Sequence, residues 1–279
     1  MEKKLLIITI TSSFAILSVL YSLSLPNIYS SQALLAPNEE DSSISSQLGG
    51  LSGIAGIAGF GFQGNNSSKT QEAIERIQSF DFFSKHFLPN IRMENLMAVD
   101  DWIPDNNTII YNQNKYDIVN DKWVSNATDS GVAIPSNQKA FLKYKRIINI
   151  SENDDSGFIS ISVKHRSPYI AKKWVEIIVN KINESMRELD KKNAQNSINF
   201  LNESTNSATV QSIKDVITSL LESQMQKLML ASAEEAYVFK IIDSAIVPEE
   251  KSEPNRALIC IFGTFLGGVL SLLIIFIQS

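Results

Sequence analysis

Cysteine is nearly absent from this sequence, since the only one among 279 residues is Cys260. A single cysteine excludes a disulfide within the chain and a cysteine-based metal site. Histidine is almost as scarce, with only His86 and His165, and we expect both at the surface. No nucleophile motif surrounds any serine. These absences argue against an enzyme, and we expect no catalytic, cofactor-binding or metal-ligating residues.

Positive charge is also in deficit. The 25 lysines and arginines are outnumbered by 30 aspartates and glutamates, which leaves a formal net charge of −5. No basic stripe or cluster is visible along the chain. Nucleic acids are recognised through such basic surfaces, so we expect no nucleic-acid partner.

Charge is missing altogether from two long runs, residues 5–25 and 257–277, each of 21 residues. A hydrocarbon core of about 30 Å needs about 20 apolar helical residues, so each run predicts one transmembrane helix. Lys3 and Lys4 precede the first run, and positive flanks stay on the cytoplasmic side. We therefore expect residues 1–4 and 278–279 in the cytoplasm and residues 26–256 in the periplasm of a bacterial inner membrane.

Glycine and proline are both absent from residues 169–247. Such breakers normally punctuate a chain, and Ser167-Pro168 is a typical helix start. Apolar residues then recur every three or four positions, which indicates helix. A single helix of this length would reach roughly 110 Å, yet the chain must return to the second uncharged run. The sequence predicts a helical hairpin over residues 168–236 that turns within 201–209, where polar residues dominate. The expected helical seam comprises Trp174, Ile178, Ile182, Ile213, Ile217 and Leu220.

The remaining residues, 26–167 and 237–256, are expected to form a base next to the membrane. Residues 27–36 and 237–247 are rich in strand formers, and residues 145–150 and 158–163 flank a turn signal as in a β-hairpin. Residues 68–86 predict one helix, and Trp102 and Trp123 are expected to be core anchors. The expected fold class is α+β: a membrane-proximal mixed sheet with helices plus a long extended helical hairpin, between two transmembrane helices.

Glycine is concentrated in two places. Residues 48–64 hold seven of the 12 glycines, with apolar residues between them. This segment is either a surface loop or an interaction loop, the latter through Ile54, Ile57, Phe60 and Phe62. The second uncharged run contains Gly263 and Gly267, a spacing that lets two membrane helices approach closely, followed by Gly268. Thr11, Ala15, Ser18 and Ser22 are the expected counterparts in the first run.

Four stretches carry a family resemblance. They are YSSQALLAP, ISVKHRSPYIAKKWVEIIVNKINESMRE, LLESQMQKLMLASAEEAYVFKIIDSAIVPEEKSEPNRALI and the glycine-rich second run. In this order, between two terminal uncharged runs, they resemble the bacterial chain-length determinant proteins, the Wzz-type polysaccharide co-polymerases. The resemblance covers essentially the whole chain.

The resemblance implies an inner-membrane protein that sets the length of a surface polysaccharide, usually lipopolysaccharide O-antigen. It implies a ring-like homo-oligomer, cooperation with a membrane polymerase and contact with lipid-linked glycan. It also implies regulation without catalysis; related proteins add a cytoplasmic kinase, which we do not expect here. The alternative is a periplasmic sensory or receptor domain, or a scaffold of another envelope system.

Overall fold

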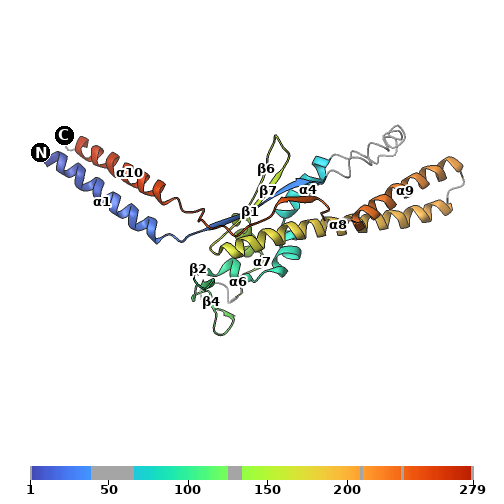
Figure 1. Ribbon diagram of the computed structural model, residues 1–279, viewed down its shortest axis with the longest axis horizontal. Helices are drawn as coiled ribbons and strands as arrows, with labels where there is room; N and C mark the ends of the chain where they lie inside the picture. Colours follow the sequence, from blue (N-terminus) through green and yellow to red (C-terminus); the bar gives the residue numbers. More distant parts are fainter. Residues whose placement is uncertain (1, 39–65, 125–133, 208–209, 234–235, 278–279) are drawn as a thin grey trace.

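The computed structural model describes residues 2–38, 66–124, 134–207, 210–233 and 236–277. It shows an elongated molecule in which a central base separates a pair of terminal helices from a projecting helical hairpin (Figure 1). The expected interaction loop at Ile54, Ile57, Phe60 and Phe62 lies outside the described residues, and it stays a prediction.

The elements follow in chain order. The helices are α1 (Glu2–Ser24), α4 (Asn66–Ile77), α5 (Phe80–Phe82), the π-helix η2 (Phe83–Phe87), the 3-10 helix η3 (Leu88–Asn90), α6 (Met93–Met97), α7 (Asn137–Ile147), α8 (Pro168–Ser207), α9 (Gln211–Ala233) and α10 (Arg256–Ile277). The strands are β1 (Tyr29–Pro37), β2 (Val99–Ile103), β3 (Thr108–Tyr111), β4 (Tyr116–Asp117), β5 (Lys122–Trp123), β6 (Ile148–Glu152), β7 (Ile159–His165) and β8 (Phe239–Asp243).

The base is built on a four-stranded sheet in the order β6-β7-β1-β8. Every pair is antiparallel, so the expectation of a mixed sheet is wrong. The reason is connectivity: β6 and β7 form a hairpin, and β8 runs antiparallel to β1, so no parallel crossover is needed. Strands β1 and β8 confirm the expected strands that follow the first uncharged run and precede the second.

Alternating residues of β1 and β7 bury one face of the sheet, among them Ala33, Leu35, Ile159, Ile161 and Val163. On the other face, the Gln32 side-chain amide donates to the Ser160 hydroxyl over 2.9 Å. This two-residue period is typical of a sheet with one face in the core and one in water. The buried face is covered by α8, which crosses the base (Figure 1).

Several local expectations need correction. The helix expected over residues 68–86 breaks after Ile77, because the Ser79 hydroxyl accepts the Phe82 N–H and starts α5. The strand expected over residues 145–150 begins only at Ile148, since α7 extends to Ile147. Trp102 and Trp123 are half-buried in the small ribbons β2–β3 and β4–β5 rather than anchored in the core.

The terminal helices α1 and α10 lie side by side, with the two chain ends together at the far end from the base (Figure 1). Among the residues that the structure describes, no helix combines the length and apolar character that crossing a membrane requires.

Candidate functional site at the base of the helical hairpin

The hairpin consists of α8, which ends at Ser207, and α9, which begins at Gln211, so the chain reverses at the end of the expected interval. The seam residues expected on α8 nevertheless do not face α9. Trp174, Ile178 and Ile182 are almost completely buried in the core of the base. The Trp174 ring lies 5.6 Å from the Phe87 ring and 4.9 Å from the His165 ring. The apolar stripe is real, but the sheet and η2 cover its first half.

The seam between the two arms is narrower than expected. Its buried residues are Ala194 and Ile198 on α8 and Ile217 and Ala231 on α9. Leu220 is half-buried. Ile213 is 50% exposed, so it is not a seam residue. The polar composition of the apical third of the hairpin leaves few apolar groups to bury there.

At the root of the hairpin, Asn183 of α8 fixes the start of β8. Its side-chain oxygen accepts the Val238 and Phe239 N–H groups, each over 2.8 Å, and its amide donates to the Phe239 carbonyl over 3.0 Å. Asn183 is only 6% exposed. A buried amide that satisfies three backbone groups holds the returning chain in one position.

Two turns further along α8, Asp190 joins three helices and the segment that precedes β8. It accepts the Tyr237 hydroxyl over 2.5 Å and pairs with Lys227 of α9 at 3.1 Å and Lys69 of α4 at 3.5 Å. The Lys69 ammonium also lies 3.8 Å from the Tyr237 ring centre, in cation–π geometry. Burial alone would raise the pKa of Asp190, but the Tyr237 hydrogen bond and the two lysines lower it. The carboxylate therefore stays ionised and ties both arms to the base.

A groove of about 460 Å³ lies between α4, α5, η2 and this part of α8. Its charged lining includes Arg76, Lys85, Lys192, Asp81 and Glu188. Three of these charges are paired, Lys85 with Asp81 at 2.5 Å and Arg76 with the nearby Glu72 at 2.7 Å. The Lys85 hydrogen bond lowers the pKa of Asp81. The groove is therefore a mixed surface, in which Phe82 and Leu189 lie among charged side chains and Asp81 is held ionised by Lys85.

His165 is buried at the end of β7, so the expectation of a surface histidine is wrong. Its Nδ1 accepts the Ser167 N–H over 2.9 Å, and its Nε2 lies 3.0 Å from the Asn95 carbonyl. Because a carbonyl can only accept, Nε2 carries the proton and the ring is neutral. Burial lowers the pKa of His165 to about 4. With both nitrogens occupied by backbone groups, His165 has a structural role.

The expected packing glycines divide into two kinds. A Cβ added at Gly263 would overlap the Ser18 side chain, and one added at Gly267 would overlap Phe14, so both glycines face α1. Nothing lies within 4 Å of the corresponding position at Gly268, which takes no part in this contact. Among the four expected counterparts in α1, Ser18 lies opposite a glycine, and Phe14 was not anticipated.

Within the described residues, no group of three or more His, Cys, Asp or Glu side chains could hold a metal ion. Three structurally important polar residues were missed by sequence reasoning: His165, Asn183 and Asp190. Asn183 and Asp190 lie four and eleven positions after Val179, on the buried side of the same helix. Polar residues at apolar positions of a helical stripe were the available signal.

Two known protein families match this chain, one in its N-terminal part and one in its C-terminal part. Residues 1–87, which contain α1, β1 and α4, match the family described as chain length determinant protein, Wzz. Residues 207–279, which contain α9, β8 and α10, match the family described as G-rich domain on putative tyrosine kinase, GNVR. Together these matches support a Wzz-type chain. No curated protein matches this chain.

Two similar solved structures carry related descriptions. One is a full-length bacterial polysaccharide co-polymerase, with 11% identity over 99% of this chain and 93% of that chain, at a TM-score of 0.39. The other is a fragment of WzzB, a polysaccharide co-polymerase from Salmonella Typhimurium, with 12% identity over 81% of this chain and 100% of that chain, at a TM-score of 0.33. Both similarities are distant.

Proposed function

We propose that this Wzz-type chain is a non-catalytic inner-membrane regulator that sets the length of a surface polysaccharide, most specifically lipopolysaccharide O-antigen. The match of residues 1–87 to the chain length determinant family carries the proposal. In this proposal the chain acts with a membrane polymerase that extends lipid-linked glycan repeats. The chain supplies no reacting group and instead organises the polymerase or the growing glycan.

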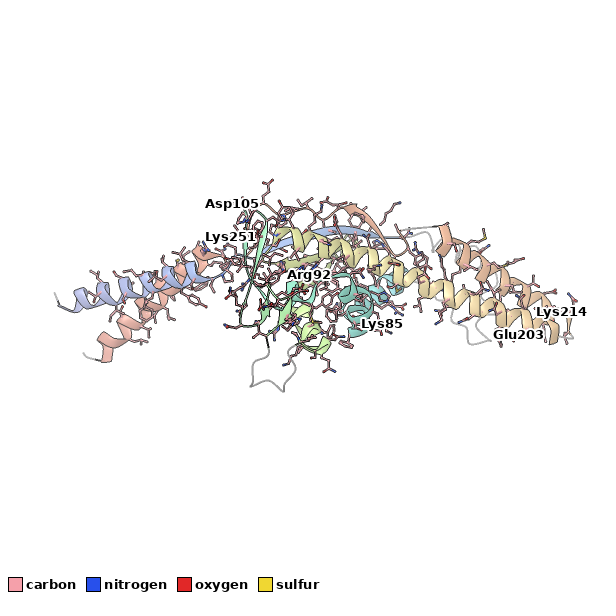
Figure 2. The ribbon with its side chains drawn as sticks, turned by 90° about the horizontal axis from the view of Figure 1, so that it is seen from below. Lys85, Arg92, Asp105, Glu203, Lys214 and Lys251 are labelled. Carbon is pink, nitrogen blue, oxygen red and sulfur yellow. The ribbon has the colours of Figure 1, made fainter. Side chains whose placement is uncertain are left out.

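The proposed location rests on the sequence. The uncharged runs at residues 5–25 and 257–277 cross the inner membrane, Lys3 and Lys4 stay in the cytoplasm, and the base and hairpin are periplasmic. Insertion of an export-dependent reporter at Asp105, on an exposed turn (Figure 2), tests this topology. Activity in the periplasm is expected. Activity in the cytoplasm would reverse the orientation and remove the basis for contact with an exported glycan.

Self-association is the second part of the proposal, as a ring-like homo-oligomer. Helix α9 exposes Ile213, Val216, Met225 and Met229, at 50%, 41%, 55% and 69%. Met225 and Met229 are one turn apart and share a face of α9, on a different side from Ile213 and Val216. An exposed apolar pair on an already paired helix is a candidate interaction surface. We take a second copy of the chain as the partner, because every cell that expresses this protein contains other copies of it.

The test of self-association replaces Met225 and Met229 with serine and uses Gln226→Ser, on the same helical turn, as the control. Light scattering of the purified full chain should show a smaller assembly for the double variant and an unchanged one for the control. A double variant that assembles like the parent would place the subunit contact elsewhere.

The decisive experiment for function is a gel of the surface polysaccharide from a deletion strain. Loss of a length regulator should broaden or shift the length distribution while polymer is still made. Complete loss of polymer would indicate a biosynthetic enzyme instead. A strain complemented with the parent chain provides the control, and one complemented with the Met225 and Met229 double variant links assembly to length.

A further inference from the structure

Three aromatic residues from separate parts of the chain meet at one end of the base. The Trp102 ring of β2 lies 5.4 Å from the Tyr29 ring of β1, in an edge-to-face arrangement. It also lies 6.2 Å from the Tyr169 ring at the start of α8. Tyr169 is 50% exposed, and Trp102 and Tyr29 are half-buried. These three residues are the aromatic cluster.

The cluster is held in place by the β2–β3 ribbon. The Trp102 indole N–H donates to the Asn107 side-chain oxygen over 2.8 Å, which fixes the ring. Arg166 pairs with Asp100 at 3.4 Å and joins the ribbon to the end of β7. The ribbon also exposes Ile103 and Ile110, at 37% and 40%. Ile103 pairs with Thr108 and Ile110 with Asp101, so both isoleucines lie on the face of the ribbon opposite Trp102. Single exposed apolar residues of this kind are ordinary.

This end of the base lies next to the terminal helices. Ile28, which precedes Tyr29, is hydrogen-bonded to Glu253 over 2.9 Å, and Ser252 donates back to Ile28 over 2.8 Å. Only two residues separate Glu253 from Arg256, where α10 begins, a reach of at most about 11 Å. In Figure 2, Asp105 on the β2–β3 turn and Lys251 on the connector both lie at the end of the base nearest α1 and α10.

Tyrosine and tryptophan rings with one polar end favour the boundary between lipid and water, where aromatic belts of membrane proteins lie. The headgroup region adds roughly 5–7 Å on each side of the hydrocarbon core. A ring cluster within a few residues of both helix ends is therefore placed to reach it. Trp102 covers one side of the Tyr169 ring, and the exposed half of that ring is free to contact lipid.

We propose that the aromatic cluster rests in the headgroup region of the bilayer and fixes the tilt of the base. This inference depends on the proposed membrane location and adds a lipid contact made by the base itself. The partner is the lipid surface around α1 and α10. The β4–β5 ribbon, which carries Trp123, is not part of the contact and provides a matched probe.

The test uses the full chain reconstituted into phosphatidylethanolamine and phosphatidylglycerol vesicles. One variant retains only Trp102 (W123F with W174F), and its match retains only Trp123 (W102F with W174F). Lipids that carry a spin label on the headgroup should quench Trp102 emission at least about two-fold more than Trp123 emission. Lipids labelled deep in the acyl chain should quench neither. Because W174F changes a core residue, W102F in the otherwise unchanged chain should also remove most of the headgroup-quenchable emission.

The outcomes separate this inference from the proposed function. If the variants float with the vesicles but Trp102 and Trp123 are quenched equally, the lipid contact is wrong and the membrane location stands. If the parent chain does not float with the vesicles, the membrane location and the lipid contact both fail. Preferential quenching of Trp102, lost in W102F, supports the contact.

Discussion

The two halves of α8 have the same backbone and opposite surroundings. In the half next to the base, Trp174, Ile178 and Ile182 are almost completely buried. In the outer half, Ala194 and Ile198 are buried but Phe200 is 67% exposed. The helix runs through both halves from Pro168 to Ser207 without a break. Burial therefore changes along one helix because the structure opposite it changes from a sheet and η2 to a single helix.

This difference has an energetic consequence. Apolar burial contributes about 25 cal/mol per Å², so the inner half of α8 stabilises the base directly. The outer half has little apolar surface to bury within one chain, and the stability of an isolated helix of this kind is marginal in water. Within one chain the hairpin therefore depends on its root, at Asn183 and Asp190. Substitutions along α8 test this gradient.

The largest effect is expected at the inner end. Trp174→Ala should destabilise the base by about 3–5 kcal/mol, because it leaves a cavity among Phe87, His165 and the sheet. Urea unfolding of the full chain, followed by circular dichroism, measures the change. A cost below about 1 kcal/mol would mean that the core does not depend on this ring.

Acid should destabilise the base through His165. The folded pKa is about 4, below the unfolded value of 6.5. The neutral ring therefore contributes fully above pH 6.5, and the contribution is lost as the pH falls toward 4, up to about 3 kcal/mol. His165→Gln removes this titration, so the stability difference between parent and variant should shrink across that interval. A difference that is constant with pH would contradict the buried neutral ring.

At the root of the hairpin, Asn183→Ala leaves three backbone groups of Val238 and Phe239 without their partner. Buried unsatisfied groups cost about 1–3 kcal/mol each, reduced where water enters, so we expect a loss of about 2–3 kcal/mol. Hydrogen exchange should accelerate at β8. Asn199→Ala, at a solvent-exposed position of the same helix, serves as the control and should change neither quantity.

Asp190→Asn should have a smaller effect, about 1 kcal/mol, because Lys227 is 43% exposed and water screens that pair. The neutral amide keeps a hydrogen-bond acceptor for Tyr237 but loses the attraction to both lysines. The effect should diminish in high salt. Asp215→Asn, which lies on the exposed side of α9, is the matched control. A salt-independent loss would indicate that the hydrogen bond, rather than the charge, matters.

The smallest effect is expected at the outer end of α8. Phe200→Ala removes a ring that is mostly in water, so the cost to the folded chain should stay within about 0.5 kcal/mol. Trp174→Ala on the same helix gives the contrast in the same unfolding assay. A cost at Phe200 comparable to that at Trp174 would show that the outer half is buried in the assembled protein.

Sequence periodicity was sufficient to locate α8, because an apolar stripe without glycine or proline is compatible only with a long helix. It could not say what covers the stripe. Trp174 and Ile182 fit a helix–helix seam as well as a helix–sheet contact, since both bury the same face. Likewise, the expected helix over residues 68–86 is divided by the Ser79–Phe82 hydrogen bond. No glycine or proline in that stretch indicates the break.

The sequence by itself determined that the chain begins and ends in uncharged runs, that a long hairpin lies between strands, and that Gly263 and Gly267 suit close helix packing. Composition and spacing are local properties of the sequence, so they can be determined without knowledge of the fold. Only the tertiary structure decided that the sheet is antiparallel, that His165 is buried and neutral, and that Asn183 and Asp190 hold the hairpin to the base. Each of these depends on groups far apart in sequence, whose meeting is set by packing rather than by any local pattern.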